Sequence, residues 1–351
     1  MRKRLNLIQF SRALVPLLVV LFHANAFMKV YFQYDFLRLP DVTKSGGVYY
    51  FFVLSGFMIY YLYHEEYGNQ KIIKHYLSSR FKRIYPIYWI LTLLIIPIYF
   101  IFPSLGKGYE REIGEIIKSL FLLPSQNKPI IGVAWSLVHT VFFYLIFSLF
   151  FLKNKSFSWG VIIIWGLMSV VFSVNLLTSS DYLMNFFFNF NNLLFLSGIV
   201  SAYVVTRHRI PYVLSLLFVI IGFLVFPLSW INEQFHFVTI SLQITTGLAS
   251  IILILGLSFI DLQKDITIPK FANYFGNASF SIYLTHYLFM SGFSKILSSN
   301  LFLSFNKMAL SILLILLSII SGCFVYSFIE KPINQKLRSK NKKVVSHHKI
   351  A

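Results

Sequence analysis

The chain contains little charge, and acidic residues are especially scarce. Only 12% of its 351 residues are charged, whereas 57% are hydrophobic. Soluble domains carry about 25% charged residues, so this composition excludes an ordinary soluble domain and indicates a protein embedded in lipid. Aspartate and glutamate number 12 against 31 lysines and arginines, and we expect no acidic side chain within the apolar segments.

Cysteine is nearly absent. The single cysteine, Cys323, lies in an apolar run. One cysteine excludes a disulfide framework and a cysteine-based metal site within the chain. We therefore interpret Cys323 as a small buried apolar residue.

Long apolar runs dominate what is present. Backbone groups in hydrocarbon must be hydrogen-bonded internally, so only helices or closed barrels span a membrane. The runs are continuous rather than alternating, which favours helices of about 20 residues. The sequence predicts an all-α integral membrane protein, a single bundle of about ten transmembrane helices, at 9–31, 46–63, 85–103, 129–152, 157–177, 186–206, 211–231, 236–260, 271–293 and 305–329.

The distribution of lysine and arginine predicts the orientation. With the N-terminus inside, the inner loops and tail hold more than twice as many of these residues as the outer loops. Positive residues favour the cytoplasmic side, so we expect both termini inside, N-in and C-in. The net charge of +19 is explained by this pattern, and no nucleic-acid partner is expected. The Arg2-Lys3-Arg4 start precedes a run too long for a cleavable signal peptide, and we interpret that run as the first span.

The predicted spans and the loops between them form one expected transmembrane domain over 1–335. A basic cytoplasmic tail is expected over 336–351. The outer loop 104–128 contains a short apolar stretch and is expected to form a surface helix.

Four polar residues interrupt the apolar spans: Arg12, His23, His139 and His286. Ionisable groups in lipid are costly and mark functional sites. Arg12 and His23 stand eleven residues apart on the first span, hence on one face, roughly 16 Å apart along the axis. The predicted spans place His23 and His286 at a similar depth toward the outside and His139 near the midplane. Each histidine could instead simply hydrogen-bond across helices, and a three-histidine metal site is a further alternative.

Arg80 and Arg83 stand one helical turn apart in a predicted inner loop at the foot of the third span. Ordinary inner-loop charge explains them. Alternatively they bind phosphate, because arginine makes bidentate contacts with it. Ser136 and His139 are one turn apart and could face one cavity.

Several segments in order resemble the membrane-bound acyltransferase-3 family. They are Phe10-Ser-Arg12 through His23, Gly47-Val-Tyr through Ser55-Gly-Phe57, Arg80-Phe-Lys-Arg83-Ile-Tyr-Pro86, Trp135-Ser-Leu-Val-His139, Ser281-Ile-Tyr-Leu-Thr-His286 and Glu330-Lys331-Pro332. One position departs from the pattern, because the family often has glutamate just after the position of His139 and this chain has Thr140.

The resemblance implies transfer of an acyl group, commonly acetyl, from cytoplasmic acyl-CoA to a sugar hydroxyl of a cell-surface or exported glycan. It implies His23 and Arg12 as catalytic residues, Arg80 and Arg83 as the acyl-CoA site, and Trp135, Ser136, His139 and His286 as pocket-lining residues. No permanently bound cofactor and no metal are expected. The implied location is the inner or plasma membrane of a bacterium, with acyl-CoA, a glycan or lipid-linked saccharide and the lipid bilayer as partners.

Two other functions are compatible with the residues alone. A multi-span transporter or exporter of acyl groups or lipid-linked sugars would suit the midplane polar residues, although no inverted repeat is visible. A non-catalytic membrane scaffold would suit the loss of a carboxylate at Thr140.

Overall fold

The computed structural model describes residues 3–38, 45–299, 302 and 304–337. These residues form helices and helical turns without a strand, as the sequence predicts. The α-helices are α1 (Asn6–Phe32), α2 (Gly47–Tyr63), α3 (Ile73–Ile101), α4 (Ile113–Leu120), α5 (Trp135–Ser148), α6 (Lys155–Ser173), α7 (Tyr182–Phe187), α8 (Phe190–Arg207), α9 (Tyr212–Phe235), α10 (Leu242–Gln263), α11 (Lys270–Leu297) and α12 (Lys307–Val325). A π-helical turn, Tyr326–Glu330, continues α12.

Eight helical stretches of the described residues are long and apolar enough to cross a membrane, against about ten predicted spans. Each predicted span nevertheless contains a helix, and α2 and α11 are the two outside the eight. α2 has only 17 residues. α11 is less apolar because its buried side carries Ser279, Ser281, Thr285 and His286.

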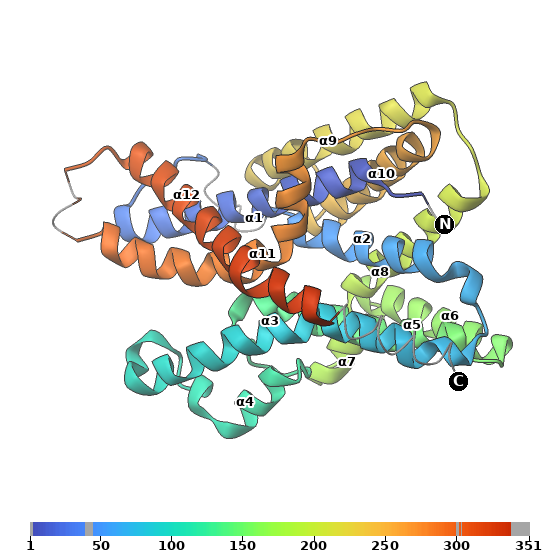
Figure 1. Ribbon diagram of the computed structural model, residues 1–351, viewed down its shortest axis with the longest axis horizontal. Helices are drawn as coiled ribbons and strands as arrows, with labels where there is room; N and C mark the ends of the chain where they lie inside the picture. Colours follow the sequence, from blue (N-terminus) through green and yellow to red (C-terminus); the bar gives the residue numbers. More distant parts are fainter. Residues whose placement is uncertain (1–2, 39–44, 300–301, 303, 338–351) are drawn as a thin grey trace.

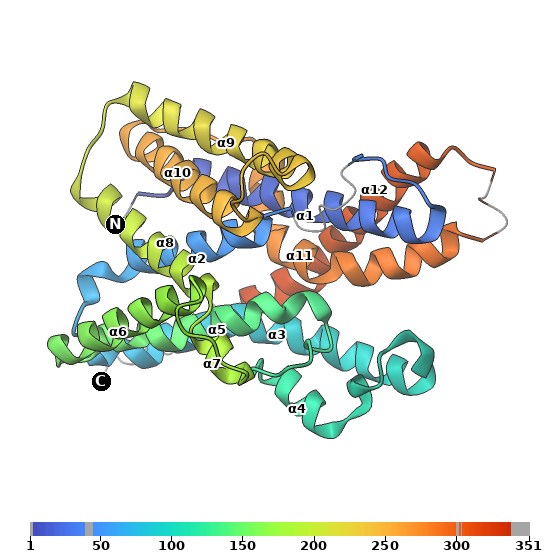
Figure 2. The same cartoon turned by 180° about the vertical axis from the view of Figure 1, so that it is seen from behind.

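Neighbouring helices pack in pairs, most extensively α9 with α10, α2 with α8, α1 with α11, and α11 with α12 (Figures 1 and 2). Glycine makes the α2–α8 contact possible. A Cβ at Gly56 would lie 2.0 Å from the Phe195 carbonyl oxygen, and one at Gly198 would lie 2.0 Å from that of Val53. Such close approach of backbones is the usual means of helix association in lipid.

Hydrogen bonds between distant segments show which helix ends lie together. Tyr61 Oη donates to the Lys3 carbonyl at 3.0 Å, which joins the end of α2 to the segment before α1. Gln263 Nε2 donates to the Ile210 carbonyl at 3.0 Å, which joins the end of α10 to the segment before α9. α1 and α2 therefore run in opposite directions, and so do α9 and α10.

One prediction about the spans was wrong. The third helix begins at Ile73, not near residue 85, so Arg80 and Arg83 lie within α3 rather than in a loop. Two acidic side chains are buried one residue beyond the predicted spans: Asp261 near the end of α10 is 2% exposed, and Glu330 in the turn after α12 is 7% exposed. Asp261 accepts from the backbone N–H groups of Leu7 and Ile8, which gives that buried carboxylate its hydrogen bonds.

The loops contain two short helices. α4 forms in the predicted outer loop, as expected of a surface helix. α7 ends before Asn189, which caps the next helix: its side-chain oxygen accepts a hydrogen bond from Asn191 N at the start of α8. The predicted basic tail lies outside the described residues from residue 338 on, as do the loop cations Arg2 and Lys44.

Candidate active site

α1 and α11 bring His23 and His286 into direct contact. His23 Nδ1 and His286 Nε2 lie 2.8 Å apart, and the ring centroids are 4.9 Å apart with planes 27° from parallel. The two residues are separated by 263 positions in the chain. The expectation that they share a depth is thus confirmed by a hydrogen bond between them.

One carbonyl group fixes where the protons of this pair lie. His286 Nδ1 is 2.6 Å from the Tyr283 carbonyl oxygen. A carbonyl only accepts, so His286 Nδ1 carries the proton. In the neutral ring Nε2 then accepts, and His23 Nδ1 must be the donor. His23 Nε2 is left with a free lone pair, as a general base requires.

A pocket lined by arginine lies between α1, α2, α3, α5 and α11. It encloses about 130 Å³, and its polar lining comprises Arg12, Ser55, Arg80, Arg83, Ser136, Thr140, Tyr144, Ser279 and Tyr283. Three of the predicted site residues, Arg12, Arg80 and Arg83, are thus brought together from α1 and α3. We call this the arginine pocket.

The three arginines are differently held. Arg12 donates from Nη1 to Gln9 Oε1 at 3.0 Å and from Nη2 to Ser279 Oγ at 3.4 Å. Arg80 is 8% exposed, lies over the Tyr63 ring, and has an Nε without a hydrogen-bond partner. Arg83 is exposed.

No arginine of this pocket forms an ion pair with a carboxylate of the part of the chain that the structure describes. Glu330 is within electrostatic range of Arg12 and Arg83, but its carboxylate accepts a hydrogen bond from Ser281 Oγ. Cations without a paired carboxylate, partly removed from water, form a site for an anionic ligand.

Ser136 and Tyr283 connect the arginine pocket to the histidine pair. Tyr283 Oη donates to the Val133 carbonyl at 2.9 Å, so it accepts from Ser136 Oγ at 2.8 Å. The backbone carbonyl of the same tyrosine fixes His286. In the sequence, Tyr283 stands out only as part of the Ser281–His286 motif, although its position three residues before His286 places it one helical turn away.

Thr140 supplies no charge to the arginine pocket. Its Oγ1 donates to the Ser136 carbonyl one turn earlier, at 2.8 Å. The hydroxyl is therefore satisfied within its own helix, and none of the described residues that line the arginine pocket carries a carboxylate.

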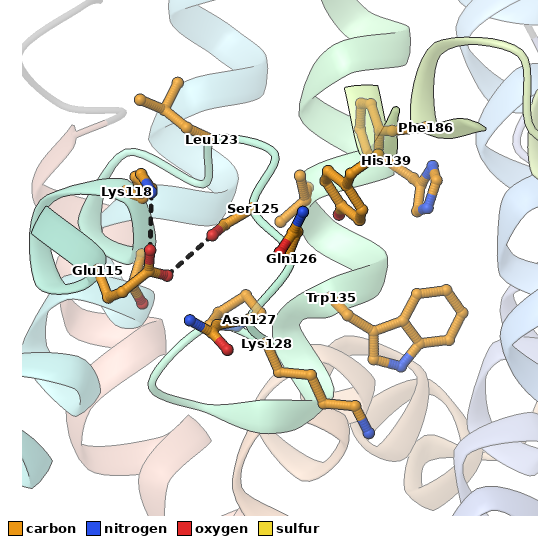
Figure 3. A pocket seen from close by; sticks show the side chains of 14 residues that line it. Glu115, Lys118, Leu123, Ser125, Gln126, Asn127, Lys128, Trp135, His139 and Phe186 are labelled. Carbon is orange, nitrogen blue, oxygen red and sulfur yellow. Dashed lines mark hydrogen bonds and ion pairs between the residues drawn. The ribbon is translucent and has the colours of Figure 1, made fainter. Parts of the chain in front are cut away.

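Trp135 and His139 line a different pocket, shown in Figure 3. It lies between α4, the loop 121–131, the start of α5 and α7, and we call it the amide pocket for Gln126 and Asn127 in its lining. His139 stacks on Phe186 with ring centroids 4.5 Å apart. The predicted pocket-lining set therefore divides, with Ser136 in the arginine pocket, Trp135 and His139 in the amide pocket, and His286 in neither.

The three histidines do not form one cluster. His139 Nε2 contacts Asn191 Nδ2 at 3.4 Å, away from the His23–His286 pair. Within the described ranges no group of three or more histidine, cysteine, aspartate or glutamate side chains could hold a metal ion.

Comparison with known proteins connects these features to a family. The family model described as "Acyltransferase domain" matches residues 6–328. The exopolysaccharide production protein ExoZ of Rhizobium meliloti (strain 1021) is 23% identical over 318 residues, covering 84% of this chain and 91% of ExoZ. No solved structure matches.

Proposed function

The chain belongs to the acyltransferase-3 family, and from that membership we propose that it is a membrane-embedded O-acyltransferase acting on polysaccharide. The donor is acyl-CoA, acetyl-CoA in the first instance, and the acceptor is a sugar hydroxyl of an exported or cell-surface glycan. The observation that carries this proposal is the oriented His23–His286 pair beside a pocket of three arginines.

The arginine pocket suits the nucleotide end of CoA. That end carries a pyrophosphate and a 3′-phosphate, and guanidinium groups bind phosphate oxygens through paired N–H donors. Arg80 and Arg83 lie one turn apart on α3, so their guanidinium groups can address neighbouring phosphates. The thioester arm would then extend toward the histidine pair.

His23 is positioned to act as the general base. Its Nε2 takes the proton of the sugar hydroxyl as the oxygen attacks the thioester carbonyl carbon. The carbon–sulfur bond breaks, the CoA thiolate leaves, and the proton on His23 Nε2 passes to the sulfur. His286 donates nothing to substrate in this scheme. It keeps the His23 proton on Nδ1 and supports the positive charge that develops on that ring.

The predicted topology gives the reaction its direction. With ten spans and both termini inside, the arginines near the start of α3 face the cytoplasm, where acyl-CoA is made. His23, two thirds of the way along α1, lies toward the outer side, where a surface polysaccharide is reached. A bacterial plasma membrane fits the exopolysaccharide role in the name of the bacterial relative.

Purified protein in nanodiscs, radiolabelled acetyl-CoA and chemically deacylated exopolysaccharide from the producing strain provide the test. We expect label in the polysaccharide with wild type and only background label with His23→Ala, with equal thermal stability of the two proteins. Undiminished transfer by His23→Ala would refute the catalytic role. Coupled flux of saccharide or acyl groups into liposomes without CoA would instead favour a transporter.

A further inference from the structure

The amide pocket is a second cavity that the proposed acyl transfer leaves unused. It encloses about 120 Å³ and has a mixed lining of amides, a carboxylate, ammonium groups and aromatic rings. Figure 3 shows these side chains coming from α4 and the loop 121–131 on one side and from α5 and α7 on the other.

The carboxylate of this pocket is held in place by its neighbours. Glu115 accepts from Lys118 Nζ at 2.7 Å and from Ser125 Oγ at 2.8 Å (Figure 3). Burial acts to raise the pKa of Glu115, but these hydrogen bonds outweigh it and lower the pKa, so the group is ionised at neutral pH. The carboxylate is a fixed acceptor at one wall of the pocket.

His139 provides an unused donor at the opposite wall. Gln243 Nε2 donates to Asn191 Oδ1 at 2.9 Å, so Asn191 meets His139 Nε2 with its Nδ2–H donor. His139 Nε2 therefore accepts, and the neutral ring carries its proton on Nδ1. Nδ1 is buried without a hydrogen-bond partner, and the side chain is only 8% exposed. A buried donor left unpaired is costly unless a ligand satisfies it.

Trp135 adds a partly exposed indole to the same pocket. The C–H face of a pyranose packs on an aromatic ring, while its hydroxyl groups both donate and accept hydrogen bonds. Amides and a carboxylate match such hydroxyls, and tryptophan offers a large apolar face with one N–H donor. A nonpolar acyl chain would leave these polar groups unpaired, and a nucleotide would place its phosphates against Glu115.

One lining residue relates the amide pocket to the proposed base. Lys128 of its lining lies within electrostatic range of the His23 ring. Trp135 and His139 face this pocket, whereas Ser136 and Thr140 on the same helix face the arginine pocket, so α5 separates the two cavities. The amide pocket lies at the start of α5, beside α4 and the loop 121–131.

We propose that the amide pocket binds a pyranose residue of the acceptor polysaccharide, an assignment that rests on the proposed acyltransferase function. Trp135 stacks against the sugar ring, Glu115 and Gln126 hold its hydroxyls, and His139 Nδ1 donates to one of its oxygens. The pocket thereby presents a neighbouring hydroxyl to His23.

Binding and transfer are measured separately to test this assignment. The probe is a deacylated oligosaccharide fragment of the producing strain's own exopolysaccharide, titrated without acyl-CoA by isothermal calorimetry. Loss of one aromatic contact of about 0.5–1.5 kcal/mol corresponds to a weakening of up to about tenfold. We expect this weakening for Trp135→Ala, partial recovery for Trp135→Phe, and no change for Trp159→Ala, whose exposed ring lies on α6 outside the pocket.

The exposed Gln126 offers a second variant that does not disturb packing. Gln126→Ala should raise the KM for oligosaccharide and leave the KM for acetyl-CoA unchanged. Unchanged saccharide binding and unchanged acceptor KM in both Trp135→Ala and Gln126→Ala would overturn the assignment even if wild type transfers acetyl groups. Saccharide binding that depends on Trp135 in a protein without transfer activity would refute the acyltransferase proposal and leave the pocket assignment intact.

Discussion

At the residue scale, the chemistry of His23 depends on a backbone carbonyl that it does not touch. The Tyr283 carbonyl fixes the proton of His286 on Nδ1, and His286 in turn fixes the proton of His23 on Nδ1. A base whose free nitrogen is set by a second residue loses activity when that residue is replaced, even though the base remains.

We predict that His286→Ala lowers kcat about 10²-fold or more, because His23 loses the acceptor that fixes its tautomer. The KM for acetyl-CoA should stay constant. His286→Gln, whose Oε1 can accept from His23 Nδ1, should recover part of the rate. Steady-state kinetics of the three proteins, together with the His23→Ala/His286→Ala double variant, provide the measurement. Independent, multiplicative losses in the double variant would show that the two residues do not act as a unit.

The arginine pocket yields a second prediction at this scale. Arg83→Ala should raise the KM for acetyl-CoA by roughly tenfold or more, because a charge-assisted hydrogen bond contributes about 1.5–3 kcal/mol. Arg80→Lys should show a smaller rise, since lysine keeps the charge but loses the bidentate geometry.

Lys74→Ala is the matched control, because Lys74 is an exposed cation on α3 outside the pocket. An equal effect of Lys74→Ala and Arg83→Ala would mean that α3 contributes only general surface charge.

At the scale of the elements, close contacts between helices depend on where glycine residues stand. α2 and α8 approach until the backbone of each occupies the space of a Cβ on the other, at Gly56 and Gly198. The sequence marks Ser55-Gly56 as a packing feature, but the partner helix follows only from the fold.

Gly56→Ala and Gly198→Ala should each destabilise the protein by about 1–3 kcal/mol, because the added methyl group forces the helices apart. Gly160→Ala on α6 is the control, since a methyl group added there would meet no other atom within 4 Å. Thermal unfolding followed by size-exclusion chromatography in detergent gives the comparison. A Gly160→Ala loss as large as that of Gly56→Ala would contradict the packing explanation.

The segment that follows α1 carries a carboxylate that responds to pH. Burial acts to raise the pKa of Asp35, but hydrogen bonds from Asn25 and Lys29 outweigh it and lower the pKa. A lowered folded-state pKa contributes stability that is present above the unfolded value of about 3.9 and is lost as pH falls through the folded value.

Wild type should therefore be more stable than Asp35→Asn at pH 6, and this difference should shrink as the pH is lowered from about 4 toward 3. Thermal unfolding of both proteins across this range measures it. A difference independent of pH would show that the ionised form of Asp35 contributes nothing to stability.

At the scale of the whole molecule, the orientation of the protein across the membrane determines whether acyl-CoA and the polysaccharide can reach the same site. The arginine pocket and the amide pocket lie on opposite sides of α5. The proposed reaction requires that the α3 arginines face the cytoplasm and the loop 121–131 faces outward.

Cysteine labelling tests this orientation in a Cys323→Ser background, which has no other cysteine. A membrane-impermeant maleimide should label Gln126→Cys in intact spheroplasts, whereas Lys74→Cys should react only after permeabilisation. Labelling of Lys74→Cys in intact spheroplasts would reverse the topology and remove the cytoplasmic donor site.

The helical fold class and several candidate site residues could be predicted from the sequence, because they depend on local composition and residue spacing. The scarcity of charge and the length of the apolar runs determine helices in lipid, because unpaired backbone groups are intolerable there. The periodicity of α1 places Arg12 and His23 on one face, and the common depth of His23 and His286 follows from counting residues. Polar residues in lipid are rare enough to identify Arg12, His23, His139 and His286 as candidates.

Only the tertiary structure decided which of these candidate residues lie together and which lie in separate pockets. It joined His23 to His286 by a hydrogen bond, and it separated Ser136 from Trp135 and His139 although all three lie within five residues of one helix. It also placed Glu330 and Asp261 in the interior and extended α3 back to include Arg80. These outcomes depend on the rotation of each helix and on which helices are neighbours. Both are set by packing between segments hundreds of residues apart, and no local pattern contains that information.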